Sequence, residues 1–108
     1  MARVVAISSE LLLSSKVEAT LKAAGHDVTL SPSLSEAPLD EVELVVADLD
    51  TGNPKALADL GIPVLGYYSH VNAETRKASE KAGIDLVVPR SRMARELPEL
   101  AHKLLSRG

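Results

Sequence analysis

The stretch Val42–Asp50, VELVVADLD, decides the fold. Its centre, LVVA, is apolar and rich in β-branched side chains, and it leads directly into Asp48 and then Asp50. A continuous apolar run of this length is typical of a strand that is buried on both faces, as strands of parallel sheets are. Ligands of such sheets bind beyond the carboxyl ends of the strands. The stretch therefore predicts a parallel sheet with a candidate site at Asp48.

The segments on either side of this stretch alternate between strand and helix patterns. Apolar runs predict strands over residues 3–8, 27–30, 44–48, 63–69 and 85–88. Helical patterns cover residues 10–24, 54–60, 73–82 and 91–105, and residues 31–43 contain no more than a turn or two of helix. This alternation predicts an α/β fold with right-handed crossovers and helices on both faces of the sheet.

Local signals mark where these helices begin and end. Ser8 or Ser9 is predicted to cap the first helix through its hydroxyl group, and Asn53 and Asn72 are predicted to cap later ones. Glycines suit the left-handed position after a helix, and Pro98 should kink the last helix. The glycines concerned are Gly25, Gly61 and Gly83.

Length and composition limit the classes of function. The 108 residues predict a single domain, 1–108, with no cysteine, a formal net charge of −3 and no aromatic residues besides two tyrosines. The negative charge and the lack of a stacking surface argue against nucleic acid, and no apolar run could span a membrane. The amino-terminal segment has no signal-peptide cleavage pattern. We therefore expect a cytoplasmic protein that contacts neither nucleic acid nor membrane.

Four features of the sequence carry a resemblance to a known family: the order of elements, the acid that ends the third strand in LVVADLD, the IPV that opens the fourth strand, and the segment KAGIDLVVPRS. In these features the chain resembles response-regulator receiver domains, the CheY-like superfamily. The resemblance covers nearly the whole chain. Within the superfamily, the sequence is similar to a divergent, stand-alone bacterial type, a pseudo-receiver of two-component signalling. The resemblance implies a flavodoxin-like, doubly wound five-stranded sheet of order 2-1-3-4-5. Pro63 follows Asp48 by only fifteen positions, so the second and third helices should be shortened.

The resemblance also implies roles for the residues at the strand ends. Asp48 matches the aspartate that accepts the phosphoryl group in a phosphorelay. Ser8 and Ser9 stand where receivers carry the acid pair that helps to hold a divalent metal. Further matches place Tyr68 at the hydroxyl position with Ser69 next to it, and Arg90 and Ser91 at the lysine–proline pair. Asp48 is the one landmark that is kept unchanged.

A charge count argues against metal binding at this site. Asp48 and Arg90 sum to zero, and Glu10 makes the total −1 only if it turns inward. We expect no metal and no cofactor; the weak alternative is Mg²⁺ held by Asp48 and Glu10, with the backbone carbonyl of Asp50 as a further ligand. Arg90 either pairs with Asp48 through its planar guanidinium or points to solvent.

Other candidate residues give weaker signals. Tyr67 and Tyr68 must point to opposite faces of a regular strand, one into the core and the other toward the site. Ser69 and His70 do not form a nucleophile–base pair, because adjacent side chains diverge and no GxSxG motif is present. No phosphate-binding glycine loop is present either. Val87 replaces the switch aromatic of receivers, which weakens signalling by rotation of an aromatic side chain.

The prediction that follows is a receiver-like signalling module that is not an enzyme and acts by protein–protein contact without phosphorylation. The resemblance implies a partner or homodimer surface formed by the fourth helix, fifth strand and fifth helix of receivers. Two alternatives stay open: a phospho-accepting regulator in which Glu10 and Ser69 complete the site of Asp48, and a small ligand-binding or enzymatic flavodoxin-like domain.

Overall fold

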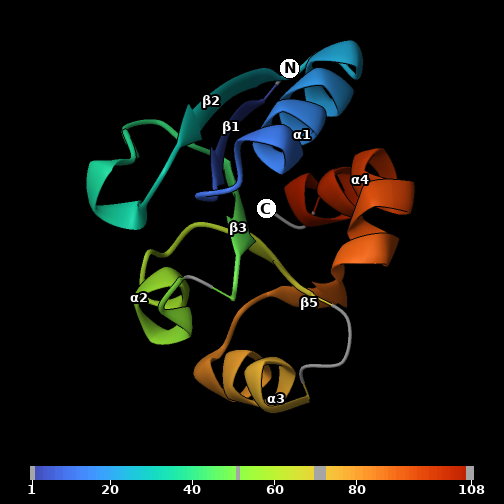
Figure 1. Ribbon diagram of the computed structural model, residues 1–108. Helices are drawn as coiled ribbons and strands as arrows, with labels where there is room; N and C mark the ends of the chain where they lie inside the picture. Colours follow the sequence, from blue (N-terminus) through green and yellow to red (C-terminus); the bar gives the residue numbers. More distant parts are fainter. Residues whose placement is uncertain (1, 51, 70–72, 107–108) are drawn as a thin grey trace.

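The computed structural model describes residues 2–50, 52–69 and 73–106. Strands and helices alternate along the chain, as the sequence pattern predicts (Figure 1). The strands are β1 (Arg3–Ile7), β2 (Asp27–Ser31), β3 (Leu44–Asp48), β4 (Val64–Tyr68) and β5 (Leu86–Pro89). The helices are α1 (Leu11–Ala23), α2 (Pro54–Ala58), α3 (Ala73–Ala82) and α4 (Arg90–Leu105), with one 3₁₀ turn at Leu34–Glu36.

The five strands form one parallel sheet of order β2-β1-β3-β4-β5. This is the predicted flavodoxin-like order, and it places the amino-terminal strand beside β3, in the interior of the sheet. Ile7 is paired with Ala47 and Asp48 with Tyr67, so the ends of β1, β3 and β4 lie level with one another. The residues that follow these strands therefore meet at a single edge.

Helices α1 and α4 cover one face of the sheet (Figure 1). Their buried apolar side chains pack on alternate residues of the strands, including Val4, Val46 and Tyr67. Leu13, Val17 and Leu21 recur at the spacing of an amphipathic helix, which explains why α1 buries one side against the sheet. The first and last helices of the chain thus share one apolar core.

The opposite face is covered by α2, α3 and the segment between β2 and β3 (Figure 1). The prediction that the second and third helices are shortened is confirmed. The second is reduced to the three-residue 3₁₀ turn, and the third is the five-residue α2. Loop residues such as Leu34 and Val42 take over part of the packing on this face.

Of the predicted helix signals that fall on described residues, Asn53, Gly25 and Gly83 agree with the structure, and the cap of α1 does not. Asn53 caps α2, because its Oδ1 accepts from the backbone N–H groups of Lys55 and Ala56. Gly25 and Gly83 follow their helices with φ of 95° and 99°. The predicted cap of α1 by Ser8 or Ser9 is wrong. Glu10 is the N-cap residue, and its side chain makes no capping hydrogen bond. The Ser8 hydroxyl instead accepts from the N–H of Glu10, before the first residue of the helix.

The last helix is kinked near Pro98, as predicted. Glu96 has the non-helical angles φ −120° and ψ 16°, two residues before the proline, which restricts the backbone that precedes it. Asn72 and His70, which the sequence analysis discussed, lie outside the described residues. Among the described residues, no helix is long and apolar enough to cross a membrane.

Candidate functional site

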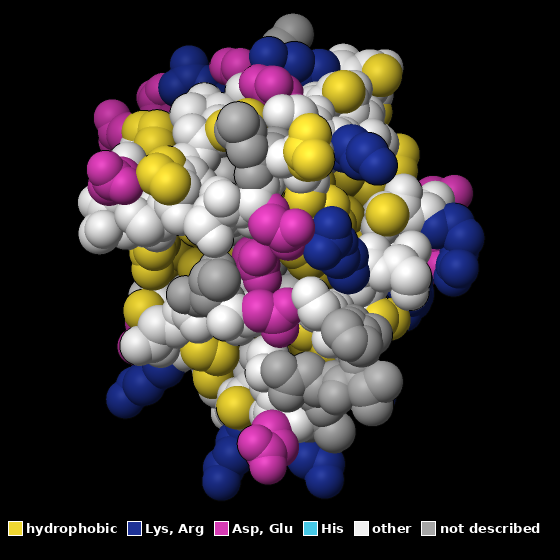
Figure 2. All heavy atoms as spheres, in the orientation of Figure 1, with side chains coloured by type: hydrophobic (Ala, Val, Ile, Leu, Met, Phe, Trp, Pro, Cys, Tyr) yellow, Lys and Arg dark blue, Asp and Glu magenta, His cyan; other side chains and the backbone are white. Residues whose placement is uncertain are grey.

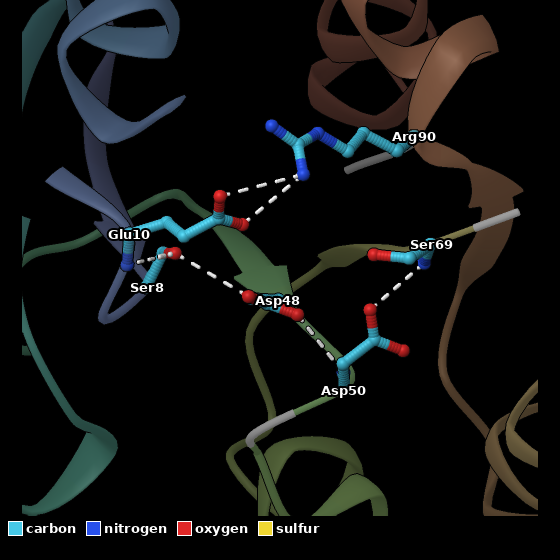
Figure 3. Close-up of polar contacts among 6 residues, drawn as sticks. All are labelled: Ser8, Glu10, Asp48, Asp50, Ser69 and Arg90. Carbon is cyan, nitrogen blue, oxygen red and sulfur yellow. Dashed lines mark hydrogen bonds and ion pairs between the residues drawn. The ribbon is translucent and has the colours of Figure 1, made fainter. Parts of the chain in front are cut away.

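Asp48 ends β3 at the carboxyl edge of the sheet, and its side chain is held from two sides (Figure 3). The Asp50 backbone N–H donates to its Oδ1 at 2.9 Å, and the Ser8 hydroxyl donates to Oδ2 at a longer 3.4 Å. Asp48 is only 6% exposed. Burial raises the pKa of its carboxyl group above the ordinary value, while the hydrogen bond from Asp50 acts in the opposite direction.

Asp50 connects the ends of β3 and β4. Its Oδ2 accepts from the backbone N–H of Ser69 at 2.8 Å, so its exposed carboxylate is tied to the neighbouring strand end (Figure 3). The sequence analysis considered Asp50 only for its backbone carbonyl. Its side chain is the feature that fixes the loop after Asp48 in place.

Arg90 pairs with Glu10 and not with Asp48 (Figure 3). Its Nη1 lies 3.1 Å from Glu10 Oε2, and the two side chains are 41% and 53% exposed. Of the two arrangements that the sequence left open for Arg90, pairing with Asp48 or pointing to solvent, the pair with Asp48 does not form, and Arg90 lies partly exposed beside Glu10. The physical reason is solvation: Glu10 meets the guanidinium at the surface, whereas pairing with the buried Asp48 carboxylate would require Arg90 to lose much of its water.

Tyr67 is a residue that the sequence analysis did not assign to the site. It is 3% exposed, packs in the core under α4 and lies opposite Asp48 in the sheet. Burial raises the pKa of its phenol to about 12; a hydrogen bond with Ser8 partly offsets this effect, and the charge of Asp48 adds to it. The strand register could have found this residue, because Tyr67 is level with Asp48 once the two strands are aligned.

The other predicted residues lie around this centre. Tyr68, predicted at the hydroxyl position, is 8% exposed, and among the described residues its hydroxyl makes no hydrogen bond to the site. Ser69 and Ser91 line an open hollow of about 430 Å³ with Arg90. Ser9 is exposed and lines a different pocket, on the α2 side of Asp48. Only part of the predicted set therefore converges on Asp48.

The formal charge of the site differs from the predicted count. Glu10, Asp48 and Asp50 bring three negative charges and Arg90 one positive charge, a sum of −2. Figure 2 shows acidic side chains gathered beside basic ones near the middle of this face. The sum resembles that of a metal-binding receiver, but the arrangement does not. Glu10 is directed to Arg90, and the described residues contain no group of three or more acidic, histidine or cysteine side chains placed to hold a metal ion.

The residues present therefore do not fit Mg²⁺. A hard divalent cation needs several oxygen ligands with free lone pairs. Ser8 and Ser9 offer neutral hydroxyl groups where carboxylates would be needed, and the Glu10 carboxylate is paired with Arg90.

Comparison with solved structures identifies the fold. A receiver domain protein from Clostridium thermocellum aligns with a TM-score of 0.82 and 15% identity, over 99% of this chain and 96% of that one. A response regulator from Thermotoga maritima gives 0.82 and 18%, over 98% of both chains. An orphan response regulator of H. pylori gives 0.78 and 20%, over 96% of both chains.

These similarities establish the CheY-like receiver fold of the chain, as the resemblance implied. No family model matches the sequence, and no curated protein matches it either. At identities of 15% to 20%, the shared property is the fold alone.

Proposed function

We propose that this chain is a single-domain, receiver-like signalling module that acts through protein–protein contact, without phosphorylation and without enzymatic activity. The observation that carries the proposal is the way the polar groups around Asp48 are already used. Arg90 is paired with Glu10, and both Asp48 oxygens accept hydrogen bonds from the protein itself. The site is satisfied in its unmodified form.

The chemistry of phosphoryl transfer supports this proposal. An aspartate that attacks a phosphoryl group must be ionised, and the charge that develops needs a cation beside it. Burial favours the neutral form of Asp48, because it raises the pKa of the carboxyl group. The nearby cation, Arg90, is already paired with Glu10. Phosphorylation would therefore have to break existing contacts without a metal to compensate.

The proposed partner surface is formed by α3, β5 and α4, the elements that correspond to the fourth helix, fifth strand and fifth helix of receivers. On α4, two partly exposed guanidinium groups, those of Arg92 and Arg95, share the single carboxylate of Glu96. This part of the helix surface therefore keeps a net positive charge. A protein partner or a second copy of the chain is the proposed occupant. Nucleic acid, membrane and cofactors are not part of the proposal, and a cytoplasmic location belongs to it.

The test is a titration with magnesium and beryllofluoride, a phosphoryl mimic, followed by backbone amide shifts of ¹⁵N-labelled protein. We expect no shifts at Asp48, Ser69 or Arg90. The Asp48→Asn variant is the matched control, because it keeps the size of the side chain and removes the acceptor carboxylate. Saturable, magnesium-dependent shifts that are lost in this variant would refute the proposal.

A second candidate function rests on the three carboxylates at this edge. If Glu10 released Arg90, then Glu10, Asp48 and Asp50 would provide the negative charge that a metal-dependent phospho-accepting regulator uses. In that case Glu10→Gln should weaken the response to beryllofluoride by about tenfold or more, whereas Arg90→Gln should strengthen it. An unchanged response in both variants would reject this candidate.

A further inference from the structure

A second pocket lies on the other side of the Asp48 backbone. It has a volume of about 220 Å³ and opens where β1 and β3 end, between the 3₁₀ turn and α2. Its apolar wall includes Ile7, Leu34 and Leu57. The pocket exists because the second and third helices of the fold are shortened: a three-residue turn and a five-residue helix do not fill the space above these strand ends.

The rim of this pocket carries uncharged polar groups. Ser9, Ser33 and Asn53 line it. Within the described part of the chain, neither the Ser9 hydroxyl nor the Asn53 amide NH₂ donates a hydrogen bond, although the Asn53 Oδ1 is used as the cap of α2. Two unused donors above an apolar floor are suited to a ligand with a hydrogen-bond acceptor at one end and a carbon skeleton at the other.

The Asp48 carboxylate belongs to the opposite face of the sheet. Leu44 and Val46 pack under α1 and α4, whereas Val45 and Ala47 pack on the α2 side. By the alternation of a strand, the side chain of Asp48 is on the α1 and α4 side, where Ser8 contacts it. Asp48 therefore borders the pocket, but its carboxylate does not point into it. A charged ligand would lose water there without gaining an ion pair.

We propose that this pocket binds a small uncharged amphipathic molecule of about ten non-hydrogen atoms, and that this ligand is the input of the module in place of a phosphoryl group. The second half of the proposal rests on the proposed function. The pocket touches Ser9 in the loop after β1, and Gly52 and Asn53 in the loop after β3. A bound molecule would fix these two loops relative to each other, next to the Asp48 site.

The test compares three probes of nearly equal shape and different charge: benzamide, benzoate and benzamidinium, each with about nine non-hydrogen atoms. Amide shifts of the full chain are followed during each titration. We expect benzamide to shift the amides of Ser9, Leu34, Gly52 and Asn53 with a Kd of about 1 mM. Benzoate and benzamidinium should bind about tenfold more weakly, because Asp48 is the one charged residue among the described residues of the lining and its carboxylate is directed to Ser8 on the other face of the sheet.

Two variants locate the binding site. Asn53→Asp keeps a good capping oxygen for α2 but removes the amide donor, and should weaken benzamide binding by about tenfold. Ser91→Ala, at the hollow beside Arg90, is the matched control and should leave the binding of benzamide unchanged. Shifts centred outside the pocket, tightest binding by benzamidinium, or an unchanged Kd in Asn53→Asp would overturn the proposal.

A beryllofluoride titration of the same sample separates the two proposals. A response to beryllofluoride with benzamide binding intact refutes the phosphorylation-independent function and leaves the pocket standing. Silence toward both reagents refutes the pocket and leaves the proposed function standing. An uncharged ligand that binds while beryllofluoride does not is the expected result.

Discussion

Asp48 and Tyr67 lie opposite each other at the ends of β3 and β4, and both side chains are almost completely buried. The phenol of Tyr67 is part of the core beneath α4, where burial raises its pKa, and the Ser8 hydroxyl donates to Asp48 Oδ2 and also offsets part of this rise in the pKa of Tyr67. This arrangement joins the polar site directly to the apolar core. Tyr67 on β4 therefore connects the strand end that carries Asp48 with the core beneath α4.

The first prediction concerns the hydroxyl group of Tyr67. Tyr67→Phe removes a buried hydrogen-bonding group and should lower the free energy of unfolding by about 1 kcal/mol, as measured by urea denaturation. Tyr68→Phe is the control: within the described parts of the chain its hydroxyl makes no hydrogen bond to the site, so its effect should be smaller. Equal losses in the two variants would contradict the role assigned to Tyr67.

The pKa of Tyr67 gives this prediction a pH signature. The folded-state pKa is raised from 10.0 to about 12, so the unfolded chain loses the phenol proton first as the pH rises. Stability attributable to Tyr67 should therefore be complete below pH 10 and should fall between pH 10 and about 12. The difference in unfolding free energy between wild type and Tyr67→Phe should change across this window.

The second prediction concerns the buried carboxyl group of Asp48. The folded-state pKa of this group is raised above the ordinary value of 3.8, so ionisation favours the unfolded state. The stability of the protein should therefore fall as the pH rises from 3.8 to the higher folded-state pKa. Asp48→Asn should therefore be more stable than wild type at pH 7, by up to about 1 kcal/mol, and the advantage should shrink near pH 3. Thermal denaturation at both pH values measures it, and a less stable variant at pH 7 would show that the ionised group is needed.

The third prediction concerns the Glu10–Arg90 ion pair. Because both side chains are about half exposed, a double-mutant cycle with Glu10→Gln and Arg90→Gln should give a coupling energy below about 1 kcal/mol. The coupling should decrease further in 1 M salt, where the screening length is about 3 Å. A coupling above about 2 kcal/mol that persists in high salt would mean that the pair is more deeply desolvated than this geometry implies.

The fourth prediction concerns the close approach of Gly66 to Leu49. A Cβ atom at Gly66 would lie 2.7 Å from Leu49 Cδ1, inside a fully packed region of the α2 face. Gly66→Ala should therefore destabilise the protein by about 1 to 3 kcal/mol in urea denaturation. Leu49→Ala removes Cγ, Cδ1 and Cδ2, the three atoms in conflict, so the double variant should lose less than the sum of the two single variants. Additive losses would contradict the proposed clash.

Much of the fold could be predicted because its elements depend on local patterns. The apolar runs of β1 and β3, the cap at Asn53 and the kink before Pro98 follow from neighbouring residues, and the alternation of elements gave the sheet order through the resemblance. The shortened helices could be predicted from the distance between Asp48 and Pro63. These features need no knowledge of distant contacts.

The site was harder to predict because it depends on the directions of side chains from four separate segments. Asp48 could be placed from its strand, but the choice of Arg90 between Asp48 and Glu10 depends on how far each carboxylate is from water. The contribution of Tyr67 depends on the register of β3 against β4. The Ser8 hydroxyl donates to Asp48 and accepts from the Glu10 N–H, and it does so in place of the predicted cap of α1.

The core shared by α1 and α4 also sets an order of events during synthesis. The core formed by Leu13, Val17 and Leu21 also contains Leu97 and Leu104. The two leucines of α4 leave the ribosome about eighty residues after those of α1, so this core can be completed only then. At about 5 to 20 residues per second, the amino-terminal half spends several seconds with only the strands available to cover the apolar face of α1. A stop codon anywhere before α4 would therefore yield a fragment that lacks the side of this core which Leu97 and Leu104 supply.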